Sequence, residues 1–203
     1  MPSSLLAGLG LGLSLIIAIG AQNLFVLRQG IRRENVLGVA LICMISDALL
    51  IIAGVAGIGL ILAQAPWAVE VVRWAGAAFL VGYGALAARR AWRPSTGALR
   101  VDSAAAGPGR TAVFATTLAL TWLNPHVYLD TVFLLGSVAN THGDARWWFA
   151  AGAVAGSILW FGSLAFGARL LSRPLASPRA WRLLDAVIAV VMIALGISLV
   201  VPH

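Results

Sequence analysis

The chain is patterned as a series of long apolar runs separated by short polar segments. A transmembrane helix needs roughly 17 to 25 predominantly apolar residues, and six runs meet that requirement. They cover residues 4–27, 36–62, 71–88, 111–138, 147–171 and 183–201. Because a helix satisfies its own backbone hydrogen bonds in lipid, we predict an all-α, polytopic membrane protein with six transmembrane helices.

Small residues within two of these runs predict close helix contacts. Gly8 and Gly12 in the first run, and Gly152 and Gly156 in the fifth, are each four residues apart. This spacing places both glycines of a pair on one helix face, where neighbouring backbones approach closely in membranes. We expect each face to pack against another helix.

The overall composition agrees with a membrane protein rather than a soluble domain. Of the 203 residues, 61% are hydrophobic and 10% are charged, whereas soluble domains carry about 25% charged residues. The single cysteine, Cys43, lies in an apolar run, so neither disulfides nor a cysteine-based zinc site is expected. The sequence holds no HExxH or GxSxG motif. We therefore predict no enzyme activity, no cofactor and no resident metal.

The distribution of positive charge predicts how the chain is oriented in the membrane. All 14 basic residues are arginines, and twelve of them lie at the end of the first, third and fifth apolar runs or in the segments that follow these runs. Arginine on alternate connections marks the cytoplasmic side, so both termini are expected to be periplasmic. The net charge of +7 thus reflects topology, and we predict membrane lipids rather than nucleic acid as partners.

The chain divides into two similar halves near its middle. Residues 92–110 are rich in Pro, Gly, Ser and Ala, which is typical of a linker, and we expect it to be cytoplasmic. The flanking parts, residues 1–91 and 111–203, each contain three runs and each begin with a run interrupted by polar residues. Three spans per half give the halves opposite orientations. Inverted repeats with paired, interrupted helices point to a transport site near the membrane midplane.

The interruption in the fourth run is the strongest candidate for that site. Pro125 removes a backbone donor and disfavours the helical conformation at Asn124, so the helix should break there. His126, Tyr128 and Asp130 follow directly. Irregular backbone at membrane depth is tolerated where it is buried in protein or lines a wet cavity. This segment therefore predicts a substrate or ion site, although His126 alone would also suit a structural hydrogen bond.

Polar residues of the first and second runs are the other candidates. Gln22 and Asn23 are adjacent amides that suit either helix–helix hydrogen bonds or a lining role. Asp47 lies near the centre of the second run, where an aspartate costs roughly 2.5 to 3.5 kcal/mol. No arginine occurs at comparable depth in any run, so proton or cation binding is favoured over an ion pair. Asp185, by contrast, is expected to be an interfacial charge balanced by neighbouring arginines such as Arg182.

Three polar motifs, in this order, resemble the basic amino-acid exporters of the lysine/arginine exporter family. They are IGAQNLFVLRQGIRR (residues 19–33), SDALL (residues 46–50) and TWLNPHVYLDTVFLLGS (residues 121–137). The resemblance covers most of the chain and implies a homodimeric, multi-pass exporter of L-arginine or L-lysine in a bacterial inner membrane, driven by proton antiport. Matched residue by residue, it points to Gln22, Asn23, Asp47, Asn124, Pro125 and Asp130.

A proton-coupled mechanism is compatible with these residues. Moving a cation out against an inside-negative potential costs roughly 2.3 kcal/mol per charge per 100 mV, which an entering proton offsets. Our hypothesis is that Asp47 and Asp130 bind the substrate when ionised and release it when protonated. The amides of Asn23 and Asn124 would hold its α-carboxylate and α-amine. An exporter of neutral amino acids or of a metal cation on the same scaffold remains the alternative.

Overall fold

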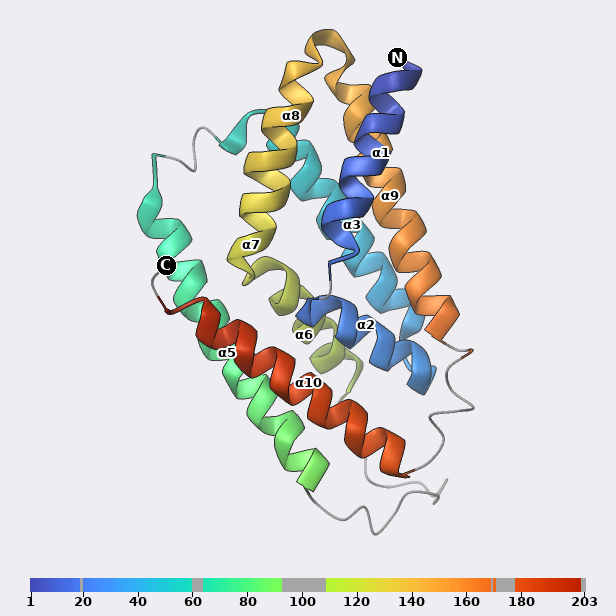
Figure 1. Ribbon diagram of the computed structural model, residues 1–203, viewed down its shortest axis with the longest axis vertical. Coiled ribbons are helices and arrows are strands. Elements are labelled where there is room, and N and C mark those ends of the chain that lie inside the picture. The colour runs from blue at the N-terminus through green and yellow to red at the C-terminus, as the bar shows by residue number, and fades with distance from the viewer. Residues whose placement is uncertain (19, 60–63, 93–108, 169, 171–177, 202–203) are drawn as a thin grey trace.

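The structure, a computed structural model, describes residues 1–18, 20–59, 64–92, 109–168, 170 and 178–201, and these residues form helices and no strand (Figure 1). Most of the expected linker lies outside the described residues. Four helical segments are long and apolar enough to cross a membrane: Val36–Val55, Pro66–Trp92, Gly143–Gly167 and Arg179–Ser198. A bent helix pair adds a fifth span if it is counted as one. The all-helical, multi-pass architecture is thus confirmed, while six spans, inverted repeats and periplasmic termini stay predictions.

The first apolar run, which we expected to be one span interrupted by polar residues at Gln22 and Asn23, is divided into two helices just before these residues. Helix α1 (Pro2–Ile16) begins with a proline in its first turn, where the missing N–H costs nothing. Helix α2 (Ala21–Arg32) starts after Gly20, whose backbone is extended (φ −121°, ψ 173°). The two helices meet at 83°. The side-chain amide of Asn23 donates hydrogen bonds to the carbonyls of Ile16 and Ala18, at and just after the end of α1. These bonds replace helical ones, which is the physical reason that the run can break there.

The fourth apolar run is interrupted where the sequence predicts it. Helix α6 (Arg110–Trp122) ends just before Asn124, whose extended backbone (φ −96°, ψ 106°) is the conformation favoured before a proline. The chain continues through α7 (Pro125–Val127), a π-helical segment η1 (Tyr128–Leu135) and α8 (Gly136–Thr141). Wider π-helical turns occur frequently at functional sites. The break at Pro125 is confirmed.

Helix α1 packs along α9 (Arg146–Gly167) through the glycine faces that the sequence predicts. A Cβ atom on Gly8 would collide with the carbonyl of Phe149, and one on Gly152 with the carbonyl of Leu5. At Gly12, an added Cβ would lie 2.9 Å from the Cα of Ala153. The two predicted small-residue faces therefore contact each other, which joins the first helix to one far along the chain.

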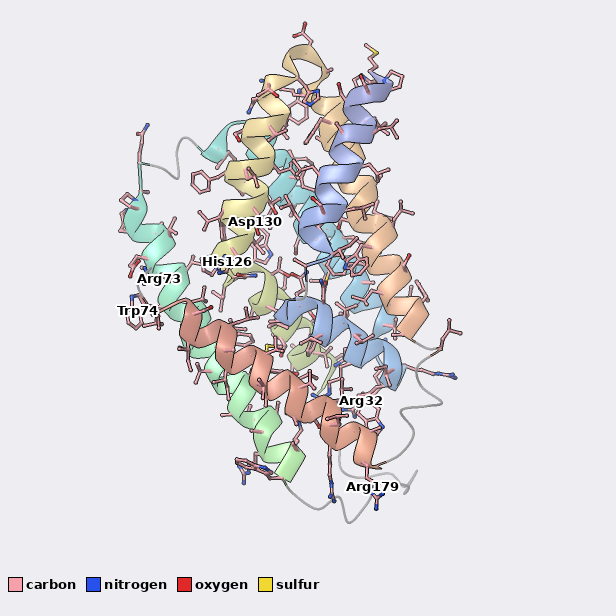
Figure 2. All side chains as sticks on the ribbon, viewed as in Figure 1. Arg32, Arg73, Trp74, His126, Asp130 and Arg179 are labelled. Atoms are coloured by element: carbon pink, nitrogen blue, oxygen red, sulfur yellow. The ribbon has the colours of Figure 1, made fainter. Side chains whose placement is uncertain are left out.

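The other helices complete a bundle, and several of the described arginines lie at one of its ends. Helix α3 (Val36–Val55) packs against α9 and η1. Helices α5 (Pro66–Trp92) and α10 (Pro178–Ser198) lie side by side on the opposite flank (Figure 1). The final turns of α2 and α5 and the first turn of α10 lie at the same end of the molecule, where Figure 2 shows Arg32 and Arg179. This arrangement agrees with the arginine pattern of the sequence.

Candidate functional site

A cavity of about 320 Å³ lies between the two broken helices. This volume falls at the lower end of the roughly 300 to 1,000 Å³ typical of small-molecule sites. Six of the eight residues predicted from the sequence line it: Gln22, Asn23, Asp47, Asn124, His126 and Asp130. Figure 2 shows His126 and Asp130 near the middle of the molecule. The two halves of the chain therefore contribute polar side chains to one space.

Asp47 is buried on α3 and takes its hydrogen bond from α9. The hydroxyl of Ser157 donates to Asp47 Oδ2 over 2.7 Å, and Ser157 itself is fully buried. Among the described residues, neither Asp47 nor Asp130 forms an ion pair. A buried carboxylate with only a hydroxyl partner lacks charge compensation. The cavity thus presents a carboxyl group suited to a proton or a cationic ligand.

The first break is held together by the side chain of Asn23. Its Nδ2 donates to the carbonyls of Ile16 and Ala18, each over 2.8 Å, and its Oδ1 accepts from Trp160 Nε1 over 3.2 Å. The amide therefore ties the end of α1 to the start of α2 and to α9. Asn23 shapes the cavity wall through these bonds, and its predicted substrate contact stays a prediction.

Gln22, the neighbouring amide, is placed quite differently. Its Nε2 is buried and has no hydrogen-bond partner among the described residues. A buried, unpaired N–H group on a cavity wall is costly unless a ligand accepts from it. Gln22 is therefore the amide best placed to donate to a bound molecule.

The second break is held by hydrogen bonds between residues close in sequence. Asn124 Oδ1 accepts from the backbone N–H of His126 over 3.2 Å, which is an N-cap, and the Tyr128 hydroxyl donates to the carbonyl of Trp122 over 2.9 Å. Neither Pro125 nor Tyr128 is among the residues that line the cavity. They stabilise the break, and Asn124, His126 and Asp130 face the space that it creates.

The sequence did not single out the apolar wall of the cavity or the partner of Asp47. Phe79, Phe161 and Leu195 line the space, but along the chain they look like any other apolar membrane residues. Ser157 follows Gly156 and resembles one more small residue on a packing face. Only the small polar hydroxyl in an apolar run hinted at a hydrogen bond.

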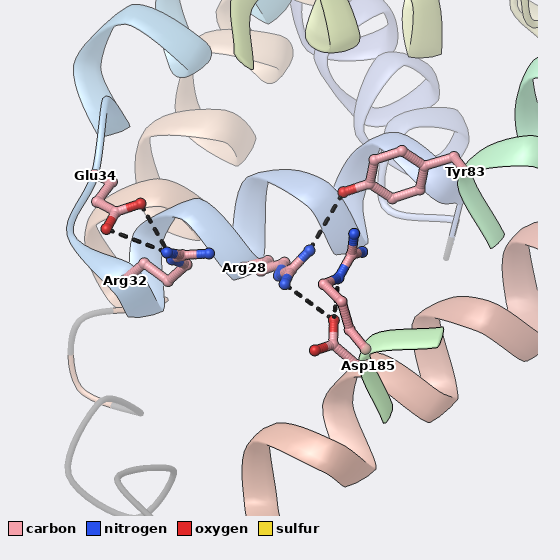
Figure 3. Close-up of polar contacts among 6 residues, drawn as sticks. Arg28, Arg32, Glu34, Tyr83 and Asp185 are labelled. Carbon is pink, nitrogen blue, oxygen red and sulfur yellow. Dashed lines mark hydrogen bonds and ion pairs between the residues drawn. The ribbon is translucent and has the colours of Figure 1, made fainter. Parts of the chain in front are cut away.

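Asp185 lies in a buried charge cluster rather than at an exposed interface. Its Oδ1 is 3.0 Å from Arg28 NH2 on α2 and 3.5 Å from Arg90 Nε on α5 (Figure 3). The expectation of an interfacial charge balanced by its sequence neighbours is therefore corrected. The carboxylate instead pairs with arginines of two other helices, because helix packing brings these distant positions together.

The acidic, histidine and cysteine side chains of the described residues do not assemble into a metal site. No group of three or more of them in that part of the chain is close enough to hold an ion. Asp47, His126 and Asp130 share one cavity but do not form such a group. The described geometry accordingly offers no specific support for the metal-cation alternative.

These features define a class of protein before any relative is considered. Apolar helices that surround a cavity, with polar side chains placed at two helix breaks, are the arrangement found in many secondary transporters. The chain belongs to the LysE type translocator family, whose profile matches residues 13–202. It is therefore a transporter and not an enzyme, as the sequence predicted.

Several relatives are similar along nearly the whole chain. A Mycobacterium tuberculosis protein, named as a candidate amino-acid transporter, is 50% identical over 93% of this chain and 92% of its own length. The lysine exporter LysE of Corynebacterium glutamicum is 40% identical over 96% of this chain and 97% of its own. The arginine exporter protein ArgO of Klebsiella pneumoniae is 43% identical over 91% and 87% respectively. No solved structure matches the chain.

Proposed function

We propose that this protein exports the basic amino acids L-arginine and L-lysine from the bacterial cytoplasm across the inner membrane, in exchange for protons. The observation that carries the proposal is the charge of the cavity wall. Its described lining includes two carboxyl groups, Asp47 and Asp130, and no arginine. In a chain with a net charge of +7, an acidic cavity favours a cationic substrate. Relatives named as lysine and arginine exporters support the same substrates.

The α-carboxylate of an amino acid requires hydrogen-bond donors or positive charge, and the first break supplies such groups. Gly20, Ala21 and Gln22 line the cavity at the N-terminus of α2. The first turn of a helix carries unpaired N–H groups and a partial positive charge, which favour an anion. Together with the unpaired Nε2 of Gln22, this turn is suited to the substrate α-carboxylate. The carboxyl groups then face the cationic side chain and the α-amine.

Proton exchange follows from the same two carboxyl groups. When ionised, Asp47 and Asp130 attract the cation; when protonated, they release it. Because like charges in one dry space repel each other, a proton competes effectively with the substrate for at least one of them. The proposed orientation places the arginine-rich end in the cytoplasm and both termini in the periplasm, with two inverted three-helix repeats around the cavity.

Counterflow in proteoliposomes tests the proposal directly. Vesicles loaded with unlabelled arginine are expected to take up labelled arginine, with competition from lysine and with a response to an imposed pH gradient. Asp47→Asn and Asp130→Asn should each lower the exchange by about 30-fold or more, as expected when one partner of a buried charge pair is removed. Asp144→Asn, an exposed aspartate in a short turn, is the matched control and should exchange normally.

Two results would contradict the proposal. Normal export and a normal pH response in both cavity variants would mean that these carboxyl groups neither bind substrate nor carry protons. Uptake of a neutral amino acid or a divalent cation, with no uptake of arginine or lysine, would be consistent with a transporter but would contradict the proposed substrate.

A further inference from the structure

A cluster of three charged residues, of which Arg28 and Asp185 are buried and Arg90 is 38% exposed, joins α2, α5 and α10. In this Asp185 cluster (Arg28, Arg90 and Asp185), both arginines share Asp185 Oδ1, at 3.0 Å and 3.5 Å. The side chains of Arg28 and Asp185 are only 9% and 11% exposed. Tyr83 on α5 completes the contact, since its hydroxyl accepts from Arg28 NH1 over 3.4 Å and its ring lies 5.6 Å from the Arg90 guanidinium carbon (Figure 3).

The cluster lies beside the cavity, toward the arginine-rich end of the molecule. The three helices that it joins also form part of the cavity wall, through Gln22 on α2, Phe79 on α5 and Leu195 on α10. The Phe79 ring stacks on Tyr83 with 6.3 Å between ring centroids. Along each helix the charged member is displaced from its cavity-lining residues toward the same end, where Arg32 and Arg179 lie (Figure 2). The cluster therefore lies between these cavity-lining residues and that end of the molecule.

The charges of the cluster are incompletely balanced. One carboxylate faces two guanidinium groups, Arg28 Nε is buried without a described partner, and so is Gln29 Oε1 on the same helix. Desolvation offsets most of the attraction in a buried ion pair, so its net stabilisation is small. Separation of the helices would return these groups to water. Such a cluster can hold a closed arrangement and still release it during a transport cycle.

We propose that the contact of Asp185 with Arg28 and Arg90 closes the cavity on its arginine-rich side. This contact must open for that side of the cavity to become accessible. Under the proposed function this side is the cytoplasmic entrance for the substrate, and the inference rests on that function for its biological meaning. Asp185 acts here as a positioning residue: it fixes α2, whose first turn lines the cavity, against α5 and α10.

The single native cysteine provides a reporter for this opening. Cys43 on α3 is fully buried in an apolar cluster to which α2 contributes Phe25 and Val26, so movement of α2 away from α3 should expose the thiol to a reagent. In Asp185→Asn, two arginines are left facing each other without a counter-charge, which favours the open arrangement where water solvates them. We expect Cys43 to react at least about tenfold faster than in the unmodified protein, because removing one partner of a buried pair is strongly destabilising.

An exposed ion pair on the same part of the chain serves as the control. Arg32 and Glu34 are 3.1 Å apart, with side chains 32% and 50% exposed. Glu34→Gln removes one carboxylate without touching the closure, so Cys43 should stay as slow to react as in the unmodified protein. Equal, slow labelling in Asp185→Asn and Glu34→Gln would overturn the proposal.

A cross-link tests the same closure in the opposite direction, by holding α2 and α10 together. Arg28→Cys and Asp185→Cys are combined with Cys43→Ala and bridged by a short, reducible bifunctional thiol reagent. We expect arginine counterflow to fall to background when the bridge forms and to recover on reduction, while a bridge between Arg32→Cys and Glu34→Cys leaves it unchanged. Full transport through the bridged 28–185 variant would refute the closure even if Asp185→Asn proved to be misfolded. Faster Cys43 labelling in Asp185→Asn, combined with no arginine transport by the unmodified protein, would support the closure and contradict the proposed function.

Discussion

The two broken helices face one cavity, but different interactions stabilise the two breaks. The first break contains no proline; Asn23 fixes it by bonds to the last carbonyl of α1, to the Ala18 carbonyl that follows, and to Trp160 of α9. The second break contains Pro125 and is capped by Asn124 and Tyr128, whose partners lie within six residues. The first break therefore depends on the packing of another helix, and the second is built into its own sequence.

This difference indicates which break is able to move. A proline break persists whatever its neighbours do, because the backbone donor is missing in every conformation. The 83° bend between α1 and α2 persists only while Asn23 and α9 hold it. Since α2 also carries Arg28, the helix released by the Asp185 cluster is the same helix whose bend is adjustable. We expect the first break to change during transport and the second to act as a fixed wall.

Among variants of the residues that stabilise the two breaks, the largest effect is expected from Asn23→Ala. The change removes three hydrogen bonds, worth about 2 kcal/mol in total at roughly 0.6 kcal/mol per bond in membrane proteins, and transport should fall at least about tenfold as the bend is lost. Thermal unfolding in detergent and counterflow measure the two effects. Asn140→Ala is the control: this exposed asparagine donates to the Gly136 carbonyl of its own helix and accepts from Arg146, outside the cavity. A variant as stable and as active as this control would show that the first break does not depend on its amide.

A smaller loss of stability is expected from Asn124→Ala. It removes one N-cap, typically worth about 1 kcal/mol, while Pro125 still enforces the break. Hydrogen exchange at the His126 amide, which loses its acceptor, should accelerate without a change at α1 or α2. A stability loss greater than that of Asn23→Ala would reverse the comparison between the two breaks.

The smallest effect is expected from Tyr128→Phe. Only the bond to the Trp122 carbonyl is lost, worth roughly 0.6 kcal/mol, and Tyr128 does not line the cavity. Arginine exchange should stay within about twofold of the unmodified rate, since no substrate contact is removed. A severe loss of exchange with normal stability would place the hydroxyl in the transport path instead.

The same contrast explains how much could be predicted from the sequence. The break at Pro125, the helical class and the glycine contacts depend on local chemistry or on composition, and the structure confirms them. The bend at Gly20, the Ser157 partner of Asp47 and the Arg28 partner of Asp185 depend on which helices pack together. Their side chains meet across more than 100 residues in the two polar pairs. No local pattern contains that information, and arginines near Asp185 in sequence were misleading.

The contact between α1 and α9 also has a consequence for the order in which the chain assembles. Chains are synthesised from the N-terminus at roughly 5 to 20 residues per second, so α1 reaches the bilayer well before α9 exists. Until Phe149 has been added, Gly8 lacks the backbone against which it packs. The first helix of a nascent chain therefore enters the membrane without this partner. The bundle closes only when the fifth apolar run arrives.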